Sequence, residues 1–224
     1  MGNYHKGVYV FDVDGTLTDT GPAHICFCND LNIEKNFGLP IIDINNPEAV
    51  RNILGTPMNQ LLRNYGFPEI NLEKLDEIYG ERFSFNEKYK SNPFPGTKEM
   101  LERIQKEGRL MVLLTSNTSQ NVKRDLGNEL WNIFDRHIDK EELTKHHQND
   151  KGQALNFLNY AECDQIPTRG FVCVGDTEKD YLAAKISGCR FIGVSYGWEI
   201  TKDDKRFPVV NNPKELEEYL LSAF

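Results

Sequence analysis

Four short apolar runs constrain the fold of this chain more than any other feature of its sequence. They span residues 7–13, 110–114, 171–174 and 191–194. The first run is rich in β-branched and aromatic residues, and all four are continuous rather than alternating, which is typical of strands covered on both faces of a parallel sheet. Turn residues such as Asp14 and Gly15 stand at their ends.

Helical patterns separate and follow these runs from about residue 97 onward. Apolar residues recur there at three-to-four spacing over 98–107, 120–131, 152–160, 178–187 and 214–221. This alternation of strand and helix predicts an α/β fold, in which a Rossmann-like parallel sheet carries helices on both faces.

Residues 20–92 follow a different pattern. They contain helical patterns and no strong strand pattern, and the helical patterns span 24–37, 47–54, 58–65 and 72–89. The segment closes on a Pro/Gly-rich stretch at 92–96 that is typical of a hinge or linker. We therefore expect a core domain of residues 1–19 and 93–224, with an all-helical domain of residues 20–92 inserted after the first strand.

Charge and hydropathy exclude several classes of protein. The formal net charge of the 224 residues is −8, which argues against the basic face that nucleic-acid binding requires. No window approaches about eighteen consecutive apolar residues, and residues 1–7 lack the apolar core of a signal peptide. The five cysteines include no CxxC pair. We expect a cytoplasmic protein with no membrane or nucleic-acid partner, whose oligomeric state these patterns leave open.

Two carboxylates follow the first run. Asp12 and Asp14 are two residues apart at a strand end, so their side chains point to the same side. Such a like-charged pair requires a cation or a shared proton, and Mg²⁺ is the usual cation for oxygen ligands. An Asp-Gly turn that merely closes the strand is the alternative.

Polar residues follow the next two runs in the same way. Thr115, Ser116 and Asn117 precede a helix, where a hydroxyl and free N–H groups can hold a phosphate oxygen; helix capping is the alternative. Asp176 and Asp180 are four residues apart, so both can lie on one helix face and add two carboxylates to the ligand-binding edge of the sheet.

Lys151 stands at the start of a predicted helix. A cation there opposes the helix dipole, so its position gains meaning only if an anion binds nearby.

In their joint order these clusters resemble the motifs of the haloacid dehalogenase superfamily. The segment Asp12-x-Asp14-Gly-Thr matches its first motif, Thr115 its second, Lys151 its third, and Asp176-x-x-x-Asp180 its fourth. The helical insertion resembles the C1-type cap of this superfamily. Three further segments resemble its phosphoglycolate phosphatase-like branch, namely Pro95-Gly96, Ala183-Ala184-Lys185 and Gly188.

The resemblance implies a Mg²⁺-dependent phosphatase. Asp12 would be the nucleophile that forms an aspartyl-phosphate, and Asp14 would be the general acid and base. Mg²⁺ would be held by Asp12, the main-chain carbonyl of Asp14, and Asp176, while Asp180 would act through water or by orienting the other ligands.

The resemblance also implies where the phosphate binds. Thr115 and Lys151 would bind the transferring phosphoryl group, with Ser116 and Asn117 beside it. The substrate would be a small phosphorylated metabolite selected by the helical cap.

Other activities of the same superfamily remain as alternatives. Asp14 disfavours carbon–halogen cleavage, because the dehalogenases lack an acid-base Asp there. A phosphonatase would need a cap lysine, and no single lysine of residues 20–92 stands out. A non-catalytic binding protein would be expected to lack Asp12 or Asp14, and both are present.

A phosphosugar mutase of the β-phosphoglucomutase type is the main rival. His24 stands at the position of a cap histidine in such enzymes and is a candidate substrate contact, although a surface role is the simpler interpretation. The basic residue expected just past Leu54 and Gly55 is not evident, because Thr56, Pro57 and Met58 stand there.

Overall fold

The chain forms two compact units in a computed structural model that describes residues 7–51, 54, 58–67, 72–84, 86–148, 150–158 and 170–222. Met1–Thr18 and Pro93–Phe224 make up the first unit, and Asp19–Asn92 make up the second. We call them the core unit and the helical unit.

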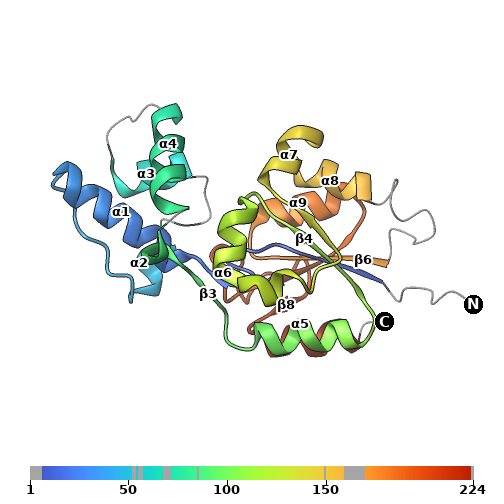
Figure 1. The fold of residues 1–224 in the computed structure, drawn as a ribbon. Helices are drawn as coiled ribbons and strands as arrows, with labels where there is room; N and C mark the ends of the chain where they lie inside the picture. Colours follow the sequence, from blue (N-terminus) through green and yellow to red (C-terminus); the bar gives the residue numbers. More distant parts are fainter. Residues whose placement is uncertain are drawn as a thin grey trace, which may run out of the picture. The chain divides into compact units, whose positions relative to one another are not determined.

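A six-stranded parallel sheet is the centre of the core unit (Figure 1). The strand order is β5-β4-β1-β6-β7-β8. The strands are β1 (Val8–Phe11), β4 (Leu110–Leu114), β5 (Arg136–Ile138), β6 (Phe171–Gly175), β7 (Arg190–Val194) and β8 (Val209–Val210). The predicted α/β fold with a parallel sheet is confirmed.

The central strand β1 sits at the switch point of the sheet. Its neighbours are β4 on one side and β6 on the other, so the chain order reverses around it. Phe11 pairs with both Leu113 of β4 and Val174 of β6, so the residues that follow these strands emerge side by side at one edge. In open α/β sheets, ligands bind at this carboxyl edge, next to the switch point.

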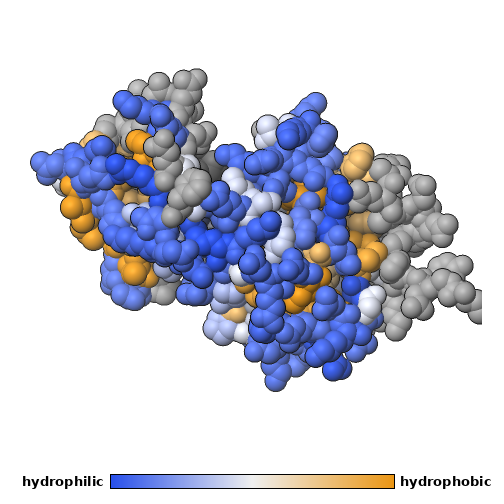
Figure 2. Space-filling view, viewed as in Figure 1, coloured by the Kyte–Doolittle hydropathy of each residue, from blue (hydrophilic) through white to orange (hydrophobic). Residues whose placement is uncertain are grey.

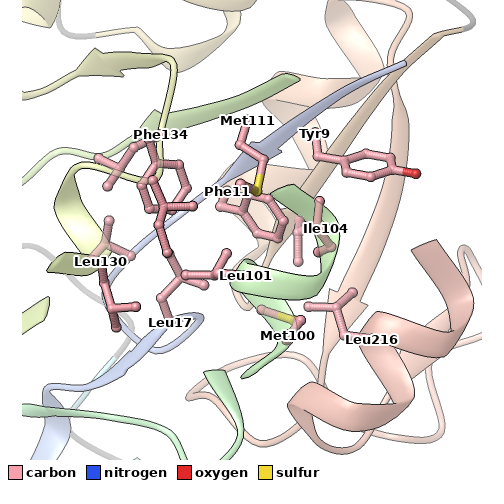
Figure 3. Packing of buried hydrophobic residues seen from close by; sticks show 14 of the residues in the cluster. Tyr9, Phe11, Leu17, Met100, Leu101, Ile104, Met111, Leu130, Phe134 and Leu216 are labelled. Atoms are coloured by element: carbon pink, nitrogen blue, oxygen red, sulfur yellow. The ribbon is translucent and has the colours of Figure 1, made fainter. Parts of the chain in front are cut away.

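Helices cover both faces of the sheet because alternate strand residues point to opposite sides. Tyr9 and Phe11 belong to a buried cluster with α5 (Thr97–Lys106), α6 (Ser119–Trp131) and α10 (Pro213–Ser222). Figure 3 shows Phe11 of this cluster among its neighbours. Val8 and Val10 belong to a second cluster with α7 (Lys140–His146), α8 (Lys151–Phe157) and α9 (Glu178–Ile186).

Two strands of the sheet and one helix were not indicated by the sequence patterns. β5 carries Arg136 and His137, and β8 has two residues, so neither shows an apolar run. Both lie at the edges of the sheet, where main-chain pairing suffices to hold a short strand. Helix α7 buries only Leu143, which gives it no helical periodicity of apolar residues.

The helical unit contains four α-helices and a 3₁₀ turn in its described part. They are α1 (Gly21–Lys35), α2 (Pro47–Arg51), α3 (Met58–Tyr65), α4 (Leu72–Phe83) and η1 (Glu87–Tyr89). The predicted continuous helix over 72–89 is wrong. Asn86 is extended there and accepts a hydrogen bond from the main-chain N–H of Lys88 at 3.0 Å, and the break lets Tyr89 stack on Phe83 with ring centroids 5.5 Å apart.

Some expectations lie partly outside the described residues. These expectations concern residues 1–6, 52–53, 55–57 and 159–160 and Cys163, which the structure does not describe. The two short strands β2 (Thr18–Asp19) and β3 (Asn92–Pro93) pair where the chain passes from one unit to the other and back.

Hydrophilic residues predominate on the face drawn in Figure 2. None of the described helices is both long enough and apolar enough to cross a membrane. These observations agree with the acidic, polar composition of the chain.

Candidate active site

The first motif forms a tight turn after β1. The main-chain oxygen of Val13 accepts hydrogen bonds from the N–H groups of Thr16, Leu17 and Thr18 at 3.1, 2.8 and 3.0 Å. Gly15 has a φ of 79°, and a Cβ at this position would lie 2.3 Å from Oδ2 of Asp176. The turn therefore needs glycine both for its backbone conformation and for the close approach of that carboxylate.

The second motif holds Asp14 with neutral donors. Asn117 Nδ2 donates to Oδ1 and Oδ2 of Asp14 at 3.1 and 3.2 Å, and Thr115 Oγ1 lies 3.5 Å from Oδ2. Thr115 Oγ1 in turn accepts a hydrogen bond from the Asn117 main-chain N–H at 3.0 Å. Thr118 is the residue that caps α6, while Ser116 is exposed. The capping interpretation therefore holds for Thr118 and leaves Thr115 and Asn117 beside Asp14.

The third motif, Lys151, is the first residue of α8 and bridges two carboxylates. Its Nζ lies 2.6 Å from Oδ1 of Asp12 and 2.7 Å from Oδ1 of Asp180, and its side chain is 15% exposed. Burial opposes its charge, but Asp12 and Asp180 outweigh this and raise the pKa of Lys151 above its ordinary value. The lysine is thus a fixed cation in the site.

The fourth motif places two buried carboxylates after β6. Asp176 accepts hydrogen bonds from Thr16 Oγ1 at 3.2 Å and from the Trp198 N–H at 2.8 Å. Asp180 Oδ2 accepts from the N–H and Oγ1 of Thr177 at 3.2 and 2.6 Å, which closes a capping box at the start of α9. Asp180 is 6% exposed, so its carboxylate is buried in the site rather than solvated at the surface.

Three carboxylates of the core unit form a group that could hold a metal ion. Oxygen atoms of Asp12, Asp176 and Asp180 lie within 4.8 Å of one another. Burial and then the charge of Asp180 raise the pKa of Asp12 to about 7, and burial and then Asp12 raise the pKa of Asp176 well above its ordinary value. Since three carboxylates face the single ammonium of Lys151, a divalent cation with oxygen preference fits this donor set.

The loop after β7 belongs to none of the four motifs, yet it contacts the turn of the first motif and Asp176. Tyr196 donates its hydroxyl to the main-chain oxygen of Thr16 at 3.1 Å. A Cβ on Gly197 would lie 2.3 Å from the oxygen of Gly15 and 2.4 Å from Cβ of Asp176. The available signal was a glycine shortly after a strand end, which is also how the other motifs begin.

The remaining candidate, His24, lies in the helical unit. It is 9% exposed in α1, and its ring stacks on Phe83 with centroids 5.0 Å apart. It is therefore a buried aromatic neighbour within that unit rather than a surface histidine. Its role as a substrate contact stays a prediction.

Comparisons with known proteins agree with this geometry. The haloacid dehalogenase-like hydrolase family matches residues 9–194. A phosphoglycolate phosphatase of Vibrio vulnificus (strain CMCP6) is 29% identical over 203 residues, which cover 84% of this chain and 83% of the relative. A phosphoglycolate phosphatase of Pseudomonas fluorescens (strain Pf-5) is 25% identical over 199 residues, which cover 84% of this chain and 69% of the relative.

Solved structures share the fold over nearly the whole chain. A haloacid dehalogenase-like hydrolase from Streptococcus pneumoniae superimposes with a TM-score of 0.74 at 18% identity, covering 96% of this chain and 98% of the other. A Thermotoga maritima protein provisionally assigned as a β-phosphoglucomutase gives a TM-score of 0.66 at 21% identity, covering 97% and 100%.

The core unit is a parallel α/β sheet with charged and polar side chains gathered at the carboxyl ends of β1, β4 and β6. The chain belongs to the haloacid dehalogenase-like hydrolase family. The predicted membership of this superfamily and of its phosphoglycolate phosphatase-like branch is confirmed, as is the predicted class of enzyme, a phosphatase of this family.

Proposed function

We propose that this protein hydrolyses a small phosphomonoester with Mg²⁺ through an aspartyl-phosphate on Asp12. The observation that carries the proposal is the different surroundings of two neighbouring carboxylates. Asp12 lies in the charged group with Lys151, whereas Asp14 is held by the neutral amide of Asn117. Two carboxylates with different surroundings suit two different roles.

The roles follow from these surroundings. Asp12 attacks phosphorus, and the bond from phosphorus to the leaving oxygen breaks while Asp14 donates a proton to that oxygen. Asp14 then accepts a proton from the water that attacks the aspartyl-phosphate, which releases phosphate and restores Asp12. Lys151 offsets negative charge on the transferring oxygens, and Thr115, Ser116 and Asn117 supply further donors.

The metal ligands in this proposal are the Asp12 and Asp176 carboxylates and the main-chain carbonyl of Asp14. A bound Mg²⁺ supplies positive charge where the phosphate sits and relieves the repulsion between these carboxylates. Asp180 already accepts hydrogen bonds from Thr177 and Lys151, so it suits a role through water or as an orienting group.

We also propose that residues 20–92 act as a substrate-selecting cap on a core of residues 1–19 and 93–224. The division of contacts after Thr18 and Asn92 supports this. In this proposal His24 is a candidate contact for the substrate. A small phosphorylated metabolite fits the relatives named above, and an acidic chain without a spanning helix in its described part is consistent with a cytoplasmic enzyme with no nucleic-acid partner.

A phosphosugar mutase is the second candidate, because the Thermotoga maritima neighbour carries that provisional assignment. The curated relatives given above are phosphatases, which favours hydrolysis. Residues 56–57, where the mutase pattern would place a basic residue, lie outside the described residues.

The experiment is a substrate panel with direct detection of phosphate. The protein is incubated with Mg²⁺ and phosphoglycolate, sugar phosphates, nucleotides or p-nitrophenyl phosphate. We expect phosphate release that EDTA and Asp12→Asn abolish and that Asp203→Asn, at an exposed aspartate, leaves intact. Activity that survives EDTA or Asp12→Asn would refute the mechanism. Conversion of a β-hexose 1-phosphate to an isomer without free phosphate would favour the mutase.

A further inference from the structure

A chain of hydrogen bonds links the first turn of α6 to Asp14. Asn121 Nδ2 donates to Oδ1 of Asn117 at 2.9 Å, and Asn117 Nδ2 donates to both carboxylate oxygens of Asp14 at 3.1 and 3.2 Å. Asn121 is 1% exposed and follows the N-cap residue Thr118 by three positions. It belongs to none of the motifs that define the site.

This chain fixes which way the Asn117 amide points. Its Oδ1 accepts two hydrogen bonds, one from the main-chain N–H of Thr118 at 2.8 Å and one from Asn121. A reversed amide would direct its NH₂ group at two donors and its oxygen at the Asp14 carboxylate, and both arrangements are repulsive. The donor on Thr118 is a main-chain N–H, so Asn121 supplies the side-chain hydrogen bond that fixes the orientation of the Asn117 amide.

The amide of Asn121 carries an energetic cost. Its Oδ1 is buried and has no hydrogen-bond partner among the described residues. An unsatisfied buried acceptor is destabilising, and an apolar side chain of similar volume would avoid that cost. The donated hydrogen bond to Asn117 is therefore what distinguishes asparagine from leucine here.

We infer that Asn121 is a positioning residue for the acid-base step: it orients Asn117, and Asn117 in turn holds the Asp14 carboxylate toward the leaving oxygen. The inference rests on the proposed function, since it assigns Asp14 the transfer of a proton to that oxygen. A weakly held Asp14 would slow reactions in which the leaving group needs a proton. In the phosphoryl-transfer step, on which kcat/KM reports, it would matter little where the leaving group departs readily as an anion; the later attack of water is the same for every substrate.

The test compares two classes of substrate in the full-length Mg²⁺-loaded enzyme. One is an alkyl phosphate, whose leaving alkoxide needs a proton; the other is p-nitrophenyl phosphate, whose leaving phenolate does not. Asn121→Asp replaces the donor by an acceptor at the same volume, and Asn121→Leu removes the donor together with the unpartnered oxygen. Asn128→Asp, at an exposed position of the same helix, is the matched control.

We expect both Asn121 variants to lower kcat/KM for the alkyl phosphate by about tenfold to a hundredfold, part of the ~10²–10⁴ that general acid catalysis contributes. For p-nitrophenyl phosphate the expected loss in kcat/KM is below about threefold, because its leaving group needs no general acid. The leucine variant should fold, because it removes a buried unsatisfied group, so it decides the matter if the aspartate variant does not fold.

Equal losses on the two substrates, or no loss on either, would overturn the inference. Asp14→Asn separates this from a failure of the proposed function, because it must show the same selective loss in stronger form. If Asp14→Asn does not show it, the assigned role of Asp14 is wrong. If only the Asn121 variants do not show it, the role of Asn121 alone is wrong.

Discussion

The carboxylates on the two sides of β1 have different surroundings. Toward β6, three buried carboxylates and Lys151 form a charged group in which the pKa of Asp12 and Asp176 is raised and a cation is needed. Toward β4, Asp14 accepts hydrogen bonds from the amide of Asn117, and the hydroxyl of Thr115 lies 3.5 Å from it. The comparison teaches that position along the chain does not set the role of a carboxylate. Asp12 and Asp14 are two residues apart and meet different partners.

Replacing Lys151 should have the largest effect on the charged group on the β6 side of β1. In Lys151→Met, the carboxylates of Asp12 and Asp180 lose their shared cation, so we expect kcat to fall by at least ~10²-fold, as when an electrostatic stabiliser is lost. Unfolding of the metal-free protein should become easier by about 3–5 kcal/mol, the usual cost of breaking a buried ion pair. Steady-state kinetics and denaturant unfolding measure both, and Lys202→Met at an exposed site is the control. Wild-type values for Lys151→Met would contradict the assignment.

The metal-free protein should lose stability as the pH rises. Because burial and Asp180 raise the pKa of Asp12 from 3.8 to about 7, the folded state binds a proton that the unfolded state has released between these values. Below about pH 4 the Asp12 carboxyl is protonated in both states and costs no stability. As it loses its proton toward pH 7, it lowers the free energy of unfolding by at most about 4 kcal/mol. Denaturant unfolding in EDTA across this range measures it. A rise in stability attributable to Asp12, judged against Asp12→Asn, would show that its pKa is lowered instead.

Gly197→Ala should disturb both the turn of the first motif and the side chain of Asp176. The added Cβ would overlap the oxygen of Gly15 and Cβ of Asp176, so the turn of the first motif and the Asp176 side chain must both move away from this loop. We expect metal affinity or kcat to fall by about 10–100-fold, as for residues that support metal ligands. Gly80→Ala is the control, because no described atom outside its own helix turn lies within 4 Å of the added atom there. Mg²⁺ titrations of activity that coincide for Gly197→Ala and wild type would remove this loop from the site.

Tyr196→Phe should have the smallest effect of these substitutions on activity. It tests whether the loop after β7 acts through packing alone. It removes one hydrogen bond to the main-chain oxygen of Thr16 and keeps the ring packed against Phe94. We expect a loss of about 0.5–1.5 kcal/mol in the free energy of unfolding, with little change in kcat. A kcat loss as large as that of Gly197→Ala would mean that the hydroxyl contributes to the chemistry directly.

Most of the sheet could be predicted because its central strands are apolar on both faces. β4 has the predicted bounds, and the motif residues follow β1, β4 and β6 as expected. The edge strand β5 could not be found, since Arg136 and His137 give no apolar pattern and its pairing with β4 uses the main chain. The break between α4 and η1 was missed because residue spacing does not show that Asn86 is extended and that Tyr89 then stacks on Phe83.

The candidate site could also be predicted only in part. Asp12, Asp14, Lys151 and Asp176 could be singled out because strand ends and helix starts place them at one edge. The hydrogen bonds that hold these carboxylates could not be predicted, because tertiary structure brings the donors to them. The Trp198 N–H reaches Asp176 from 22 residues away, and Asn117 reaches Asp14 from 103 residues away. Such contacts depend on loop conformations that no local pattern specifies.

The central claim is that Asp12, and not Asp14, carries the phosphoryl group. The most direct measurement is a single turnover quenched in acid, followed by borohydride reduction of any acyl phosphate and peptide mass spectrometry. The account predicts a reduced residue at position 12 alone, with no such product in Asp12→Asn. Reduction at position 14, or active single-turnover chemistry with no reduced residue at any time point, would contradict it.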